Sequence, residues 1–380
     1  MINTLKMQWQ RLRLLAAFVL LLSTASLERA ARLCSWIREN GGHIHEHCAV
    51  DKASYGYGLY AEETISPGSL LCAVPSRVCI SAPADSSALD SIAIGLCQEV
   101  LRSDAGFFAP FVDILPKDTS YIPACYDDDR LQSSLAGTSL SLDARAMRRE
   151  WDRAFDARPV PGVSRAAYTW ARSTLQGRAY RVDKDVCFIP FITFANHDDA
   201  MAGVGSSSSY LYPTRSNGVS HPKDFILLQA DRRYTKGQQI LTSYGSLSFQ
   251  QKLLSFGYLD RASTYSITTV DMPGSASGEQ IEIRTPIAWG RVTRSKGLDL
   301  RKELSGATRI MAEAGHCSRQ QAAADIERFL RKRLLELKSG APRGFDVDDC
   351  TDYSADDNDD ETIRKVEIKS IVAILKEVNG

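Results

Sequence analysis

The feature that most constrains the fold is a set of short apolar runs, each of strand length and each ended by a turn signal. They are rich in Val, Ile, Leu and aromatic residues, which favours β-strands. The runs cover residues 58–65, 70–81, 186–193, 225–230 and 239–243. Segments with helical periodicity interrupt them at residues 88–103, 141–157 and 165–179. Strands split by a helical block predict an α+β fold.

Local turn signals add detail to this prediction. The triplet Ser66-Pro67-Gly68 favours a turn, so we expect the runs 58–65 and 70–81 to pair as a hairpin. A helix over 33–40 should stop at Gly41, because Gly commonly ends helices. We also expect a helix over 246–256 and a Gly/Ser-rich loop over 203–209.

The tail has a different composition. After residue 285 it becomes rich in Ala, Arg, Glu and Leu, with amphipathic helices predicted over 318–338 and 362–378. The intervening residues 346–361 include nine acidic residues, which repel one another and predict a solvated loop. Their spacing lacks the central Gly of a calcium-binding loop. We therefore expect a separate helical domain over 285–380.

Composition indicates a globular protein and narrows the classes of partner. Lys plus Arg and Asp plus Glu number 46 each, so no global field favours nucleic acid or anionic membrane. The nine cysteines never take a zinc-binding spacing, which predicts buried thiols in a reducing compartment and no metal. His43, His45 and His47 would share one face of a strand, but the residues around them favour a loop over a metal site.

The N-terminus introduces a conflict about compartment. Basic residues precede the apolar run 14–22, and small residues follow at 23–25, which is the layout of a signal peptide. This predicts targeting to an organelle or the secretory route. The alternative is an amphipathic leader or a misassigned start, which leaves the protein cytoplasmic, with membrane contact only if the segment is retained. Residues 1–27 are therefore left out of the fold prediction.

Three short motifs could carry chemistry. Gly56-Tyr57-Gly58 with Ala61 satisfies a relaxed dinucleotide fingerprint, but the turn at 66–68 follows where a helix should run, so the glycines are better explained by close backbone approach. Asn196-His197 ends the apolar run FIPFITFANH, and Tyr244-Gly245 ends another. Taken alone, each of these two pairs fits a turn as well as a ligand anchor.

The order of these motifs resembles that of the SET-domain methyltransferases of the Rubisco large-subunit lysine methyltransferase type, a group that includes the actin-histidine methyltransferases. The similar segments, from residue 33 to 259, are LCSWIRENGG (33–42), YGYGLYAEETISPGSLLCAVPSRVCIS (55–81), FAPFVDILP (108–116), LAGTSL (135–140), WARSTLQGRAY (170–180), FIPFITFANH (188–197) and ILTSYGSLSFQQKLLSFGYL (240–259). In the tail only RKVEIKSIVAIL (364–375) is similar.

The resemblance implies a β-rich SET domain over 33–259 with a pseudoknot-like core, a helical insertion over about 85–180, and an all-α substrate-binding domain after it. It implies S-adenosylmethionine as cofactor, a protein substrate, no metal, and a monomer. The implied catalytic residue is Tyr244. The implied cofactor-binding residues are Tyr55, Gly56, Tyr57, Gly58, Arg178, Asn196, His197, Phe256, Gly257 and Tyr258. Arg178, Thr193 and Tyr210 are the implied substrate contacts.

Three residues depart from the family pattern and leave the acceptor open. Thr193 stands where an aspartate is usual, Phe249 where an asparagine is usual, and Phe256 where lysine-specific members commonly have tyrosine. We expect a protein-lysine N-methyltransferase acting on a non-histone protein. The alternatives are a protein-histidine N-methyltransferase and a catalytically degenerate SET protein that acts as a binding module.

Overall fold

The computed structural model describes ten segments of the chain. They are residues 27–53, 56–197, 209–213, 224–242, 247–258, 265–271, 280–286, 299–314, 318–340 and 359–379. The chain forms two compact units, the first made of residues 1–118 and 154–245 and the second of 119–153 and 246–380. Within the described segments, none of the helices combines the length and hydropathy that a bilayer crossing requires.

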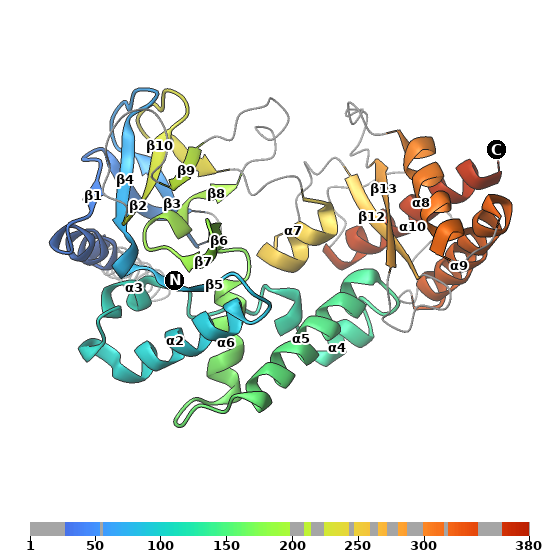
Figure 1. Ribbon diagram of the computed structural model, residues 1–380, viewed down its shortest axis with the longest axis horizontal. Helices are drawn as coiled ribbons and strands as arrows, with labels where there is room; N and C mark the ends of the chain where they lie inside the picture. The colour runs from blue at the N-terminus through green and yellow to red at the C-terminus, as the bar shows by residue number, and fades with distance from the viewer. Residues whose placement is uncertain are drawn as a thin grey trace, which may run out of the picture. The chain divides into compact units, whose positions relative to one another are not determined.

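The first unit is built on three small sheets (Figure 1). One has the order β1-β4-β10-β9, with all its neighbours antiparallel. Its strands are β1 (His43–Ile44), β4 (Leu70–Pro75), β10 (Phe225–Ala230) and β9 (Ser209–Pro213). The two central strands, β4 and β10, are buried along almost their whole length. Their sequences are apolar runs rather than alternating patterns, as is typical of strands that are covered on both faces.

A second sheet has the order β2-β3-β11-β8. Its strands are β2 (Cys48–Ala53), β3 (Gly56–Ala61), β11 (Gln239–Thr242) and β8 (Asn196–His197). Strands β2 and β3 form a hairpin in which Ala53 faces Gly56, whereas β8 runs parallel to β11. The third sheet joins β5 (Ile80–Pro83), β7 (Asp185–Phe188) and β6 (Ala179–Val182).

Two strand predictions are wrong. The turn at Ser66–Gly68 exists, with Gly68 at φ +79°, but the strands on either side of it do not pair with each other. Instead β3 pairs with β2 and β11, and β4 pairs with β1 and β10. The run 186–193 is strand only to Phe188, since Pro190 cannot donate to a ladder, and the 3-10 turn η4 (Ile192–Phe194) follows.

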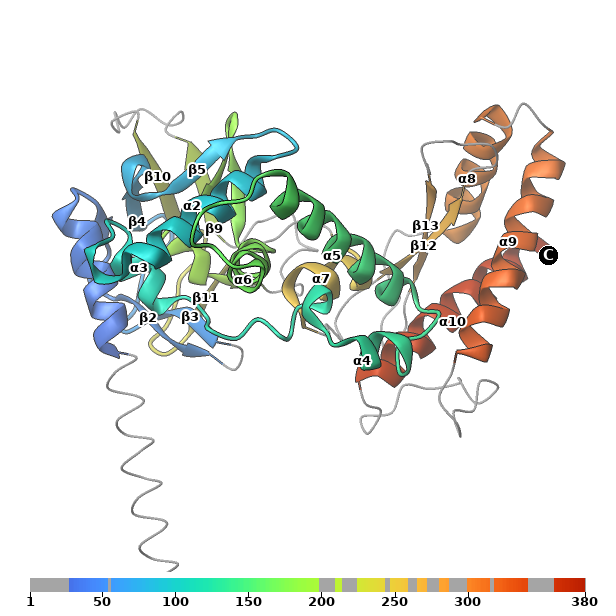
Figure 2. The same cartoon turned by 90° about the horizontal axis from the view of Figure 1, so that it is seen from below.

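Helices cover the sheets of the first unit, and most match their predicted ranges. The first helix covers the described residues 27–39 and stops before Gly41, whose φ is +78°. Helices α2 (Ala88–Arg102) and α6 (Arg165–Leu175) lie side by side in both views (Figure 2). The short helix α3 (Ala109–Ile114) precedes the second unit. A buried ion pair locks α2 to α6, because Asp90 accepts from the Tyr168 hydroxyl at 2.7 Å and lies 3.0 Å from Arg172 Nε.

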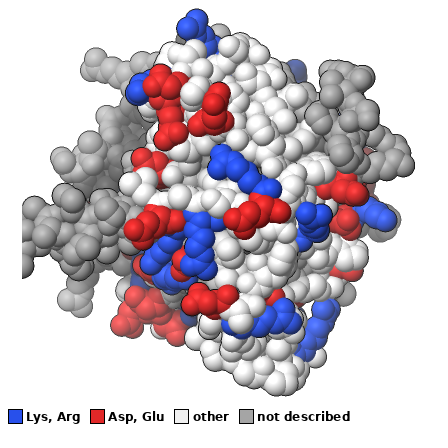
Figure 3. All heavy atoms as spheres, turned by 90° about the vertical axis from the view of Figure 1, so that its left-hand side faces the viewer, with Lys and Arg blue, Asp and Glu red and all other residues white. Residues whose placement is uncertain are grey.

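The surface of this unit carries mixed charge. Figure 3 shows acidic and basic side chains interleaved on one face. Arg32, for example, lies within 4 Å of both Asp104 and Asp113 at exposed positions, which is typical of weak surface pairs.

The second unit combines a β-hairpin with helices. Strands β12 (Tyr265–Asp271) and β13 (Gln280–Pro286) pair antiparallel and pack against the C-terminal helices (Figure 1). The helices are α4 (Asp128–Gln132), α5 (Ser139–Ala157, whose last four residues count with the first unit), α7 (Phe249–Phe256), α8 (Leu300–Ala314), α9 (Arg319–Ser339) and α10 (Asp359–Asn379). Their apolar faces form a core that includes Val270, Ile283, Ile326 and Ile374.

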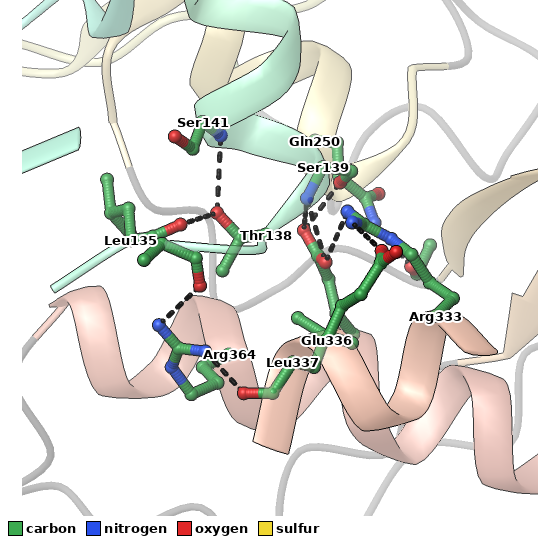
Figure 4. A network of polar contacts seen from close by, with 12 residues as sticks. Leu135, Thr138, Ser139, Ser141, Gln250, Arg333, Glu336, Leu337 and Arg364 are labelled. Carbon is green, nitrogen blue, oxygen red and sulfur yellow. Dashed lines mark hydrogen bonds and ion pairs between the residues drawn. The ribbon is translucent and has the colours of Figure 1, made fainter. Parts of the chain in front are cut away.

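A buried polar network ties α9 and α10 to the loop before α5 (Figure 4). The guanidinium of Arg364, which is 0% exposed, donates to the carbonyl oxygens of Leu337 at 2.7 Å, Ser134 at 2.8 Å and Ala136 at 2.9 Å. The carboxylate of Glu367 accepts from the backbone N–H of Ser139 at 2.8 Å. Both side chains satisfy backbone groups at helix ends, so the end of α9 is fixed within its unit.

Candidate functional site

Strands β3, β8 and β11 bring two of the predicted motifs together in the first unit. Strand β11 pairs with β3 through Gln239–Tyr60 and Ile240–Leu59, and with β8 through Leu241–Asn196 and Thr242–His197. The Nδ2 of Asn196 donates to the carbonyl oxygen of Tyr57 at 3.2 Å. Residues 139 positions apart in the sequence therefore meet at one place.

Gly58 lies under this contact and has no room for a side chain. A Cβ added there would lie 3.2 Å from Asn196 Nδ2 and 3.1 Å from Tyr60 Cε2, and would overlap with the side-chain amide of Gln239. The Nε2 of Gln239 is buried without a hydrogen-bond partner among the described residues. Two amide side chains thus converge over the glycine, and sequence reasoning missed Gln239 because nothing in its local sequence singles it out.

Gly56 has the opposite surroundings. It is exposed, its φ is +98°, and an added Cβ would meet nothing within 4 Å. Between the two glycines, Tyr57 is half-buried, with its ring edge-on to Phe194 at a centroid distance of 5.8 Å. The strand therefore changes within three residues from open backbone to a tightly packed position. Burial and the nearby carboxylate of Asp51 raise the pKa of the Tyr60 hydroxyl.

A strained turn delivers the chain into β8. Phe191 has φ +68° and ψ −57°, and the N–H of Ile192 donates to the carbonyl of Pro190 at 2.8 Å, which defines a γ-turn. Such a conformation costs a non-glycine residue roughly 1–3 kcal/mol and persists only where its surroundings impose it. Here the fully buried ring of Phe191 and the hydroxyl of Tyr180, which donates to Ile192 O at 3.4 Å, hold the turn.

Thr193 and Arg178 are neighbours. The hydroxyl of Thr193, which is buried, donates to the Arg178 carbonyl at 3.4 Å. The guanidinium of Arg178 is half-buried and donates to the carbonyl of Thr174 at 3.3 Å, near the end of α6. A neutral hydroxyl suffices for this contact, so the threonine has a structural use where an aspartate is usual.

Other predicted residues are described in part or not at all. Tyr55, Tyr244 and Gly245 lie outside the described residues, and for His197 the structure describes the backbone alone. Tyr210 belongs to β9, opposite Gln229, in the other four-stranded sheet.

Phe256, Gly257 and Tyr258 belong to the second unit, at the end of α7. Gly257 ends that helix at φ +72°, and an added Cβ would lie 2.5 Å from the carbonyl oxygen of Tyr121. The rings of Phe256 and Tyr258 lie 6.2 Å apart. Their predicted part in closing a pocket stays a prediction.

Phe249 has a clear structural role in the same unit. Its ring is fully buried in a cluster with Leu131, Leu140, Leu253 and Val366. An asparagine there would bury an amide among apolar groups, at a cost of roughly 1–3 kcal/mol. The departure from the family pattern therefore coincides with core packing.

The loop predicted for the three histidines is wrong for His43, which lies in strand β1 opposite Ala73, whereas His45 and His47 follow the strand in a turn. The N–H of His47 donates to Nδ1 of His45 at 3.1 Å, which leaves the proton of that neutral ring on Nε2. Across the described segments, no group of three or more His, Cys, Asp or Glu residues is arranged to hold a metal ion.

Solved structures of LSMT match the chain along nearly its whole length. The crystal structure of the SET domain of LSMT bound to lysine and AdoHcy gives a TM-score of 0.66 at 16% identity, over 93% of this chain and 91% of that chain. The structure of Rubisco LSMT bound to AdoMet gives 0.65 at 15% identity, over 92% and 91%. The SET domain of LSMT bound to MeLysine and AdoHcy gives 0.63 at 14% identity, over 92% and 90%.

The chain has the SET-domain fold of these structures. No protein-family model and no curated protein sequence matches it. The SET-type fold confirms the predicted α+β class and the predicted resemblance to the Rubisco LSMT type, with several small antiparallel sheets and C-terminal helices.

Proposed function

We propose that this chain is an S-adenosylmethionine-dependent protein methyltransferase whose acceptor is a lysine side chain of a non-histone protein. The observation that carries the proposal is the contact between Asn196 and Tyr57 over Gly58, in a fold shared with proteins solved with AdoMet and lysine. The first unit supplies the cofactor-binding strands in this proposal.

The residues present fit such a cofactor. The exposed backbone at Gly56 meets nothing that would exclude a ligand, and a side chain there would be strained at φ +98°. Gly56, Tyr57 and the main chain of Asn196 and His197 would hold the group, with Arg178 close to its carboxylate or to the substrate backbone. When bound, the cofactor supplies a methyl group on a positively charged sulfur.

The chain's own residues then have to align the acceptor and exclude water, because transfer of a methyl group is an in-line displacement. A free lysine has a pKa of ~10.4, so apolar walls that disfavour its ammonium form favour the reactive amine. In this proposal the Tyr244 hydroxyl, with backbone carbonyls, orients the acceptor nitrogen. Thr193 and Tyr210 border the acceptor.

The test compares lysates of cells with and without the protein. Each lysate is incubated with purified protein and radiolabelled S-adenosylmethionine, and labelled proteins are identified by mass spectrometry. We expect one protein to gain methyl-lysine in the deficient lysate and to be already methylated in the other. If no protein is labelled at any enzyme concentration, the proposed activity is wrong.

A histidine acceptor is the second candidate, and Phe256 favours it. Lysine-specific members of the family commonly have a tyrosine at this position, whereas the phenyl ring offers no hydroxyl to a lysine amine. Acid hydrolysis of the labelled protein separates methyl-histidine from methyl-lysine. Finding only methyl-histidine would replace the lysine assignment while leaving methyl transfer intact.

A degenerate SET protein that binds without catalysis is the third candidate. Thr193 and Phe249 motivated it, but both have structural uses, as the hydroxyl contact to Arg178 and the buried ring indicate. These structural uses account for both departures without requiring a loss of activity. Calorimetry that finds no micromolar binding of S-adenosylmethionine would instead support the binding module.

A further inference from the structure

The outward face of helix α9 carries a cationic stripe in the second unit. The stripe consists of five exposed side chains at helical spacing: Arg328, Arg331, Lys332, Leu335 and Lys338. Residues three, four and seven apart share one face of a helix, so these side chains point the same way. The opposite face of α9 buries Ile326, Leu330 and Leu337 in the core.

The acidic residues of α9, which are Asp325, Glu327 and the exposed Glu336, lie at the edges of the stripe rather than on it. Arg328 is 75% exposed and lies 3.0 Å from Asp325, whose side chain is only 22% exposed. Arg331 is 60% exposed and lies 2.7 Å from Glu327, which is 27% exposed. The guanidinium groups therefore project further into solvent than their partners do. Exposed pairs of this kind are weak and leave the cations available to a second carboxylate.

Leu335 makes the stripe more than a charged face. Leu335 is 66% exposed, which is more than any other large hydrophobic residue in the described segments. It lies between Arg331 and Lys338, so the four cations surround one apolar side chain. The Leu337 carbonyl near the end of α9 accepts from Arg364 of α10 at 2.7 Å, which ties this turn of the helix to its neighbour (Figure 4).

We infer that the α9 stripe is a docking surface for an acidic segment of a partner protein, one that pairs several carboxylates with an apolar residue. Charge complementarity selects the carboxylates, and Leu335 selects an apolar neighbour. A lipid surface fits less well, because interfacial helices insert a broad apolar face and α9 uses its own in the core. The charged backbone of a nucleic acid has no apolar group that Leu335 could contact. The inference rests on the substrate-binding role proposed for this helical domain and names the chemistry of the segment that would bind there.

The test measures fluorescence anisotropy of a labelled peptide that combines glutamates with leucines at helical spacing, titrated with the full chain. A peptide with glutamine in place of glutamate is the negative probe. We expect micromolar binding of the acidic peptide, weakened about tenfold by the double substitution Arg328→Gln and Arg331→Gln. Leu335→Ala should weaken it about threefold, the effect of one exposed apolar contact.

The matched control is Arg301→Gln with Lys302→Gln on α8, two cations that are 83% and 85% exposed in the same unit. This control should bind like the unchanged chain, and both variants should keep its thermal unfolding midpoint. Equal losses in both double variants would overturn the inference, as would unchanged binding after substitution of the stripe.

Two other occupants are distinguished by added arms. Stripe-dependent binding to phosphatidylserine vesicles without peptide binding would replace the protein partner by a membrane. Peptide binding that appears only after the acidic residues from 346 to 357 are changed to Asn and Gln would show that the chain's own segment competes for the stripe. Either result overturns the proposal of a partner protein.

Discussion

Replacing Gly58 by alanine probes the contact on which the proposed cofactor site depends. The new methyl group would lie 3.2 Å from Asn196 Nδ2 and would overlap with the Gln239 amide. Gly58 is not among the glycines with positive φ, so the cost comes from packing rather than from backbone strain. The side chains of Gln239 and Asn196 must therefore both move.

The magnitude follows from those two movements. Turning Gln239 away from its preferred rotamer costs about 0.5–1.5 kcal/mol. Displacing Asn196 breaks its 3.2 Å bond to the Tyr57 carbonyl, which costs about 0.5–1.5 kcal/mol. Together these give roughly 1–3 kcal/mol, or a midpoint lowered by about 2–12 °C for a unit of this size. If Asn196 anchors the cofactor, affinity for S-adenosylmethionine should fall about tenfold or more.

Calorimetry measures both quantities, by thermal scanning and by titration with S-adenosylmethionine. The control is Gly95→Ala in α2, where the new methyl would lie 3.5 Å from Ile80 Cγ2, an ordinary contact. Because alanine favours helix, this control should raise the free energy of unfolding by about 0.5–1 kcal/mol, and the midpoint should rise slightly with it. A Gly58→Ala protein that unfolds and binds the cofactor like the unchanged chain would refute the reasoning.

Three further predictions concern other parts of the chain. Gly257→Ala should cost about 2–5 kcal/mol in urea unfolding, because it combines left-handed backbone with a 2.5 Å approach to the Tyr121 carbonyl oxygen; a loss below ~1 kcal/mol would contradict this packing. Burial raises the pKa of Cys48 to about 12 and that of Cys97 to about 11, so iodoacetamide at pH 8 should modify these thiols only after the protein unfolds in urea. Rapid labelling of the native protein would argue against their burial. Tyr244→Phe should lower kcat for methyl transfer by about 100-fold with little change in cofactor affinity, as removal of one orienting group does; an unchanged kcat would exclude the role.

Local sequence patterns predicted the elements better than their pairing. The runs 225–230 and 239–243 became β10 and β11, because their apolar residues fit a buried strand. The Ser66–Gly68 turn was also present, yet the strands beside it joined different sheets. Strand partners are chosen by packing across the whole unit, which a turn signal does not report.

Other elements were missed although the sequence carries their signal. Strand β13 alternates Ile281 and Ile283, both buried, with exposed residues, and β12 contains β-branched residues. This period-2 pattern is typical of a strand. The helical composition of the tail begins at residue 285, next to the end of β13. This stronger signal hides the short strand pattern just before it.

The candidate site shows which features local sequence does not encode. Gly56, Gly58 and Asn196 were recognised from the order of motifs, whereas the bond from Asn196 to Tyr57 joins residues 139 apart. The positive φ of Phe191 has no sequence signal either, because phenylalanine rarely adopts it. Packing around a fully buried ring imposes this conformation, and only the folded unit provides that packing.

The most direct measurement of the proposed function is isothermal titration of the full chain with S-adenosylmethionine, with ATP as a control nucleotide. The site over Gly58 predicts one saturable site with micromolar affinity and no binding of ATP. Absence of binding at millimolar cofactor would contradict the proposal.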